Sequence, residues 1–246
     1  MLLLVKNGNS EKIEIRISLA KTIDSLNECL FYNKSLPKKE LNYLFNIVND
    51  RQMHTGTNIG QISLTPNDYV EGSRLFTGER LHTKLAVKNI LTQETFRVIS
   101  ISDENNTNTN GSLELANKWL TESCFAEFCS VGECCHSTIG YMRYLNTIKP
   151  KNTKKTLITF IELLKQYRNK MKRWEGFPFY YTLLALSEID LIEAKNELRF
   201  ALPACERMIN GIENVNVNIY SQRRLDIIRQ VFSQCQYDLS QFLTTS

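Results

Sequence analysis

Apolar side chains recur at alternating spacings of three and four residues in two segments of the second half of the chain. The segments contain Leu157, Phe160, Leu164, Tyr167 and Met171, and Leu225, Ile228, Phe232, Cys235 and Leu239. An α-helix has about 3.6 residues per turn, so this spacing places the apolar side chains on one buried face. With ten Gly and five Pro, the chain also lacks the turn residues that an all-β sandwich needs. The sequence therefore predicts a mainly α-helical fold.

The helices expected in the second half follow one another in pairs. The expected pairs are 112–119 with 137–148, 153–171 with 179–187, and 190–202 with a last helix over 225–239. Helix pairs repeated about every 40 residues are typical of helical-repeat proteins. We therefore expect a paired-helix repeat, either α/α toroid-like or a helical solenoid.

A different period occurs near the N-terminus. Ile13, Ile15 and Ile17 alternate with polar residues, which is the pattern of a half-buried strand. The short apolar run 2–5 precedes it, and residues 7–10 (NGNS) supply turn residues between the two. These features predict a short N-terminal β-hairpin.

The stretch 103–111 (DENNTNTNG) is the clearest loop in the chain. It contains no apolar residue, and its Asn and Thr side chains compete for backbone hydrogen bonds. It would separate a part comprising the hairpin and further helices (1–102) from a paired-helix part (112–246). The alternative is one continuous domain.

Four of the seven cysteines and one of the three histidines lie within thirteen residues. They are Cys124, Cys129, Cys134, Cys135 and His136. Thiolate sulfur and imidazole nitrogen are ligands of zinc, but the spacing C-x4-C-x4-C-C-H matches no standard zinc motif. Three interpretations stay open: buried structural thiols, a metal site, or a redox-active thiol pair.

A metal site in this segment requires a turn. In a continuous helix Cys129 and Cys134 would point about 140° apart, and only a turn at 131–132 lets them converge with His136. The nearest acidic residues for orienting the His136 ring are Glu133 and Glu127. We expect the turn to form but no cofactor to be bound stoichiometrically, with zinc as the alternative.

A tryptophan and a Gly/Pro turn precede the most aromatic expected helix. Trp174-Glu-Gly-Phe-Pro leads into Phe-Tyr-Tyr-Thr-Leu-Leu-Ala-Leu, over 179–186. This segment resembles the repeat of terpenoid cyclases and protein prenyltransferases, where a Gly/Trp turn precedes a Tyr-Thr-x-x-Ala-Leu helix. The segment 116–145 resembles a second copy, and the resemblance extends from Ser112 onward. It implies an α/α toroid fold.

The sequence departs from that family in its functional motifs. Gln166 lies eight residues before Trp174 with no intervening Gly, and no Asp-rich acid motif is present. The resemblance therefore implies the fold and not the activity. The aromatic residues expected to line a concave surface are Trp119, Trp174, Tyr180 and Tyr181.

Basic residues concentrate between residues 148 and 175. This segment contains nine Lys or Arg and only two Glu. Lysines opposite an apolar helix face are typical of a solvated surface, which is the favoured interpretation. The alternative is a nucleic-acid interface over 149–173, where Tyr167 and Trp174 would stack on bases.

Other features narrow the class of protein. The chain contains no P-loop, dinucleotide-binding or zinc-protease motif. Its longest apolar run, 177–186, is about half a membrane span, and an odd number of cysteines is typical of a reducing compartment. We therefore expect a cytoplasmic protein without membrane insertion.

These observations favour a cytosolic helical-repeat binding or scaffold protein. Its concave aromatic surface would receive a protein partner or an apolar small molecule. An α/α toroid-type enzyme acting on an apolar small molecule, with a Cys/His metal site, is one alternative. A nucleic-acid-associated protein is the other.

Overall fold

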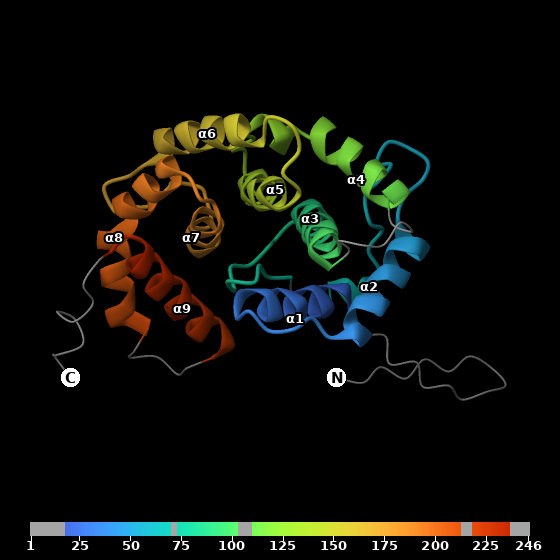
Figure 1. Cartoon of the computed structure of the whole chain (residues 1–246), viewed down its shortest axis with the longest axis horizontal. Helices are drawn as coiled ribbons and strands as arrows, with labels where there is room; N and C mark the ends of the chain where they lie inside the picture. The colour runs from blue at the N-terminus through green and yellow to red at the C-terminus, as the bar shows by residue number, and fades with distance from the viewer. Residues whose placement is uncertain (1–17, 70–72, 103–109, 213–217, 237–246) are drawn as a thin grey trace.

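The computed structural model describes residues 18–69, 73–102, 110–212 and 218–236, and most of them lie in nine α-helices (Figure 1). The helices are α1 (Leu19–Phe31), α2 (Lys38–Arg51), α3 (Lys84–Ser102), α4 (Asn110–Glu122), α5 (Cys134–Ile148), α6 (Thr153–Leu164), α7 (Phe179–Glu188), α8 (Ile192–Ile212) and α9 (Ile219–Gln234). The prediction of a mainly helical fold is confirmed. The predicted hairpin lies outside the described residues. None of these helices is both long and apolar enough to cross a lipid bilayer.

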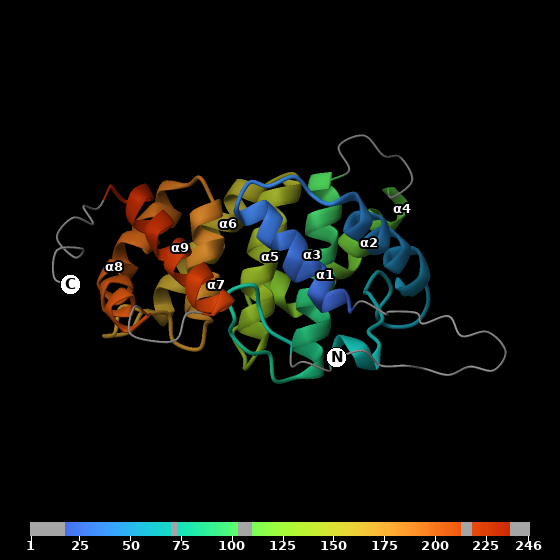
Figure 2. The ribbon, with the colours of Figure 1, turned by 90° about the horizontal axis from the view of Figure 1, so that it is seen from below.

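Helices α3, α5 and α7 lie side by side in the middle of the molecule and appear almost end-on in Figure 1. Helices α4, α6 and α8 pack on the outside of α3, α5 and α7, respectively. Figure 2 shows α2 and α4 at one end of the molecule and α8 and α9 at the other. The buried apolar residues form one cluster from α1 to α9, so the parts before and after 103–109 share a core.

Helix α3 approaches α5 closely because α5 contains a glycine at the contact. A Cβ atom added at Gly140 would lie 2.2 Å from Oε1 of Gln93 on α3. The Gln93 amide donates a hydrogen bond of 2.9 Å to the backbone oxygen of Ser137. The missing side chain of Gly140 thus lets a polar side chain of one central helix reach the backbone of the next.

A buried ionic network also joins the three central helices. The Glu94 carboxylate on α3 accepts hydrogen bonds from Arg143 Nη1 of α5 (2.5 Å), the Tyr181 hydroxyl of α7 (2.6 Å) and Arg97 Nε (2.8 Å). Burial alone raises the pKa of Glu94, but the two guanidinium groups and the Tyr181 hydroxyl outweigh it and lower this pKa to about 2. Glu94 is therefore ionised, and its buried charge is compensated.

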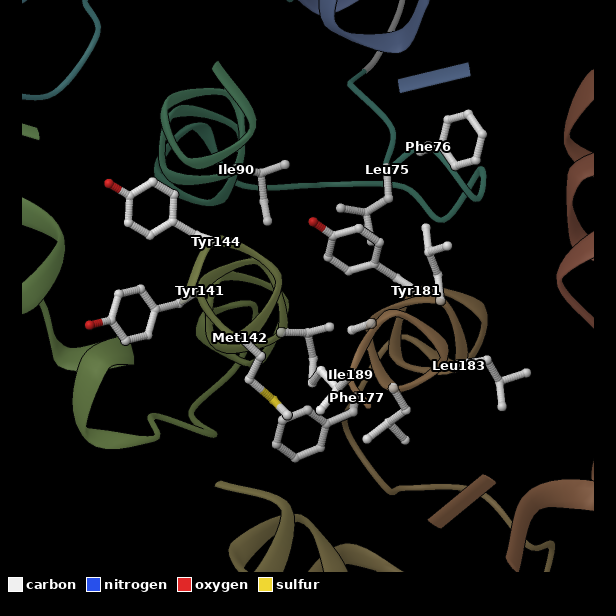
Figure 3. Packing of buried hydrophobic residues seen from close by; sticks show 14 of the residues in the cluster. Leu75, Phe76, Ile90, Tyr141, Met142, Tyr144, Phe177, Tyr181, Leu183 and Ile189 are labelled. Carbon is white, nitrogen blue, oxygen red and sulfur yellow. The ribbon is translucent and has the colours of Figure 1, made fainter. Parts of the chain in front are cut away.

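The apolar core agrees in part with the helix periods of the sequence. The helix predicted over 153–171 ends at Leu164, so the predicted burial of Met171 is wrong, and this residue is 58% exposed. Residues predicted to be buried in the second half are Leu157, Phe160, Leu164, Leu183, Leu184, Ile228 and Phe232, and none is more than 4% exposed. In Figure 3, Met142 of α5 points toward Phe177, and Tyr181 of α7 points toward Leu75. Helix α5 contacts both α3 and α7 and lies in the centre of the core.

The last described helix is fastened to the first. Arg223 of α9, only 1% exposed, donates hydrogen bonds to Asp24 (2.7 Å) and Glu28 (2.6 Å) of α1. Its guanidinium also reaches the backbone oxygen of Phe76 at 3.1 Å. These contacts hold together segments that are almost 200 residues apart in the sequence.

Candidate metal centre

Three cysteines lie on the connection between α4 and α5. A 3-10 helix (Cys124–Glu127) follows α4, and α5 begins at Cys134. Phe125 is buried and lies 5.6 Å, between ring centroids, from both Trp119 of α4 and Tyr141 of α5. Cys124 is therefore held next to an aromatic anchor.

A second aromatic anchor fixes the position of Cys129. Phe128 has a left-handed backbone conformation, with φ of 63°. Such a conformation is unfavourable for a residue with a side chain and persists only where the surroundings impose it. Here the Phe128 ring is surrounded by Phe160 (5.3 Å), Phe177 (5.7 Å) and Tyr167 (6.2 Å between centroids). Burial of the Phe128 ring therefore fixes the backbone position at which the next residue, Cys129, begins.

The chain then turns, as the sequence predicted. Gly132 has φ of +53°, a conformation that favours glycine, and the Cys134 N–H donates to the Val131 oxygen at 3.1 Å. The Thr138 hydroxyl of α5 donates a 2.6 Å hydrogen bond to the Cys129 backbone oxygen. This turn brings Cys129 back toward the start of α5.

The sulfur atoms of Cys124, Cys129 and Cys134 all lie within 4.8 Å of one another. The Sγ atoms of Cys124 and Cys134 are 3.3 Å apart. Cys124 is exposed and the other two are half-buried, so the sulfur triangle opens toward solvent. Zinc binds thiolates at about 2.3 Å, which separates the sulfurs of a tetrahedral site by about 3.8 Å. Side-chain shifts of about 1 Å would therefore accommodate the ion.

The surroundings of the triangle make the Cys129 thiol easier to deprotonate than an ordinary cysteine, even without a metal. Burial alone raises the pKa of Cys129, but hydrogen bonds from the Val131 N–H and from the thiols of Cys134 and Cys124 outweigh it, so this pKa is lowered. Burial and the neighbouring sulfurs raise the pKa of Cys134. Cys134 is also the first residue of α5, where the helix dipole stabilises negative charge. A cation bound among the sulfurs would replace the remaining thiol protons.

The other two residues of the sequence cluster have different partners. Cys135 is buried, and its sulfur lies 2.9 Å from the Gly132 oxygen and 2.8 Å from the Gly176 oxygen. His136 Nδ1 lies 3.3 Å from the Cys135 sulfur, and burial lowers the pKa of His136. The three side chains that converge are therefore Cys124, Cys129 and Cys134. The expectation that His136 would be the third member is not met.

Glu133 connects this loop to α3. Its carboxylate accepts hydrogen bonds of 2.6 Å from the backbone N–H groups of His82 and Thr83, just before the first turn of α3. It therefore caps that helix, and its charge partly offsets the effect of burial on the pKa of His136. Glu127, the other acidic residue considered for His136, is exposed.

The four aromatic candidates occupy two kinds of environment. Trp174 and Tyr181 are core residues, 2% and 1% exposed, whereas Trp119 and Tyr180 are half-buried. Trp174 and Tyr180 both contact Phe179, at centroid distances of 6.0 and 5.4 Å. Trp119 lies on α4, where it packs against the cysteine-bearing loop. The structure therefore places all four against other core side chains.

Most lysines of the basic segment are exposed, in agreement with a solvated surface. The exposed ones are Lys149, Lys151, Lys154, Lys155, Lys170 and Lys172. Arg168 has a structural partner, because its Nη2 donates to the buried carboxylate of Glu197 at 2.5 Å. The Arg168 side chain therefore anchors α8 through an ion pair with Glu197.

The spacing of residues in the sequence could have identified the three cysteines that converge. Cys124, Cys129 and Cys134 are spaced five residues apart, and Phe125 and Phe128 stand between the first two. Aromatic residues flanking a polar loop indicate that the loop is packed onto the core. The expected convergence of Cys129 and Cys134 with His136 did not take these two aromatic anchors into account.

Comparison with models of known protein families, with curated proteins and with solved structures finds no match. Three convergent sulfurs at a helix start can bind a soft metal ion.

Proposed function

We propose that this helical protein binds one zinc ion through the thiolates of Cys124, Cys129 and Cys134. The observation that carries the proposal is the mutual approach of the three sulfurs to within 4.8 Å. Two buried phenylalanines and a glycine turn hold the three thiols in this arrangement. The geometry thus favours zinc over the metal-free cluster that the sequence analysis expected.

Three protein ligands leave the fourth position of a tetrahedral zinc ion to another donor. Within the described residues, no fourth His, Cys, Asp or Glu joins the converging group. Structural zinc sites are usually closed by four protein ligands, whereas sites that keep a water or exchangeable ligand use three. Because Cys124 is exposed, the fourth position would face solvent.

The rest of the molecule serves as a scaffold for this centre. The packing of α4, α6 and α8 outside α3, α5 and α7 supports a paired-helix solenoid, in which the metal ties the α4–α5 connection to the central layer. All seven cysteines are free thiols, which supports residence in a reducing compartment such as the cytoplasm. Burial of Trp174 and Tyr181 makes the sulfur site better supported than an aromatic ligand pocket.

Equilibrium dialysis of the reduced protein against zinc, followed by metal analysis, tests the proposal. We expect one zinc per chain in the wild-type protein and a large loss of affinity in Cys129→Ser. Cys29→Ser is the matched control, because Cys29 is a half-buried cysteine on α1 outside the triangle. Equal zinc content in both variants, or none in the wild type, would overturn the proposal. Circular dichroism of each variant shows whether the helices are retained.

A further inference from the structure

The exposed cysteine of the centre lies close to the first residue of α5. Cys124 is exposed, and its Sγ lies 3.3 Å from that of Cys134. A disulfide bond is about 2.05 Å long, so these two atoms need to move only about 1.2 Å closer. Cys124 follows the end of α4 and Cys134 begins α5, so the two sulfurs face each other across one short connection.

We infer that Cys124 and Cys134 form a disulfide bond when a hydroperoxide reaches the site, and that this bond prevents zinc from binding. The second part rests on the proposed zinc function, whereas the first does not. Cys124 and Cys134 thus form a site of reversible oxidation, and the oxidant is a hydroperoxide. Zinc binding needs all three thiolates, and the disulfide removes two of them.

The reaction proceeds in two steps that balance. The Cys124 thiolate attacks one oxygen of the hydroperoxide, the O–O bond breaks, and an alcohol (or water) leaves with a proton from solvent. Cys124 is then a sulfenic acid. The Cys134 sulfur attacks the Cys124 sulfur, the S–S bond forms, the S–O bond breaks, and the oxygen leaves as water. The two sulfurs together lose two electrons, which reduce the hydroperoxide, and any bound zinc leaves as the aqueous ion.

Other cysteines are less suited to this reaction. Cys135 is buried, and two backbone oxygens surround its sulfur. Cys129 belongs to the triangle, but it is half-buried, whereas Cys124 is the exposed cysteine that a hydroperoxide meets first. Cys205 is fully buried in α8. Exposure of Cys124 and its short distance to Cys134 therefore make these two cysteines the pair that forms the disulfide.

Hydrogen peroxide added to the purified full-length protein, with and without zinc, tests the inference. We expect two of the seven thiols to disappear, peptide mapping to find the Cys124–Cys134 disulfide, and a chromogenic chelator to detect released zinc. A dithiol reductant should restore both thiols and zinc binding. Loss of no thiols, a disulfide between another pair, or oxidation to sulfinic acid without a disulfide would overturn the inference.

Two variants separate this inference from the zinc proposal. Cys129→Ser should still form the Cys124–Cys134 disulfide although it no longer binds zinc. Cys134→Ser should lose the disulfide and leave Cys124 as a sulfenic acid that a dimedone-type probe traps. Disulfide formation in a wild-type protein that never binds zinc would refute the zinc function alone. Zinc binding without disulfide formation would refute the modification alone.

Discussion

The indole Nε1 of Trp174 donates a hydrogen bond of 2.9 Å to Oε2 of Glu197, and both side chains are buried. Arg168 binds the other oxygen of the same carboxylate at 2.5 Å. A buried carboxylate is costly unless such donors surround it. Trp174 is therefore a partner of a buried charge in α8, and this relationship explains why it lies in the core.

Replacing Trp174 with Phe should remove this donor while keeping an aromatic ring. Oε2 of Glu197 would keep only the longer hydrogen bond from Arg168 Nε (3.2 Å), and we expect the free energy of unfolding to fall by about 1–2 kcal/mol. Denaturant titration measures the change. Trp119→Phe is the control, because Trp119 is half-buried on α4 and should show a smaller loss. A larger loss in the control would contradict the assigned role of Trp174.

Gly140→Ala should destabilise the contact between α3 and α5. The new Cβ would lie 2.2 Å from Gln93 Oε1, and the resulting overpacking should exceed the gain in helix propensity, for a net loss of about 1–2 kcal/mol. Gly111→Ala on α4 is the matched control, since nothing lies within 4 Å of its added Cβ. The control should be neutral or slightly stabilised in thermal unfolding. Similar effects of both substitutions would argue against the close helix contact.

Leu164→Ala should test the apolar face predicted from the spacing of three and four residues. Leu164 is fully buried, so the substitution should lower the free energy of unfolding by about 2–5 kcal/mol. Met171→Ala, at a position that is 58% exposed, should change it by less than about 0.5 kcal/mol. A loss below about 0.5 kcal/mol for Leu164→Ala would place that face in solvent.

The fold was predictable where apolar residues recur with a regular period. The spacing around Leu157 and Phe160 indicates a helix and its buried face, because burial of one face imposes that period. Glu94 and Arg143 could not be assigned to the core in this way. Charged residues on a helix are normally solvated, and only the approach of three helices shows that these two compensate each other.

The candidate site was predictable in part for a similar reason. The density of cysteines and the turn at 131–132 are visible in the sequence, because glycine favours the conformation that a tight turn requires. The choice of Cys124 over His136 depends on the orientation of a 3-10 helix and on where Phe125 and Phe128 are buried. These features depend on the tertiary packing of the α4–α5 connection, and no regular spacing of residues in the sequence predicts them.

Acid should destabilise the protein partly through Glu94. Its pKa is lowered from 4.5 to about 2 in the folded state, so its ion pairs stabilise the fold above the unfolded-state pKa. This contribution should disappear as the pH falls from about 4.5 toward 2. We expect Glu94→Gln to be less stable at neutral pH and to lose less stability over this range than the wild type.

Denaturant titrations across this pH range measure the difference. Glu114→Gln, at an exposed position on α4, is the control and should follow the wild-type pH dependence. Parallel curves for Glu94→Gln and wild type would show that Glu94 is not the ionised centre of the network.

X-ray absorption at the zinc edge tests the central claim most directly. The account predicts three sulfur neighbours at about 2.3 Å and one oxygen or nitrogen neighbour at about 2.0–2.1 Å for zinc bound to the reduced protein. In Cys129→Ser the three-sulfur signature should disappear. A wild-type spectrum with four sulfurs, or with oxygen and nitrogen neighbours only, would contradict a three-cysteine centre formed by Cys124, Cys129 and Cys134.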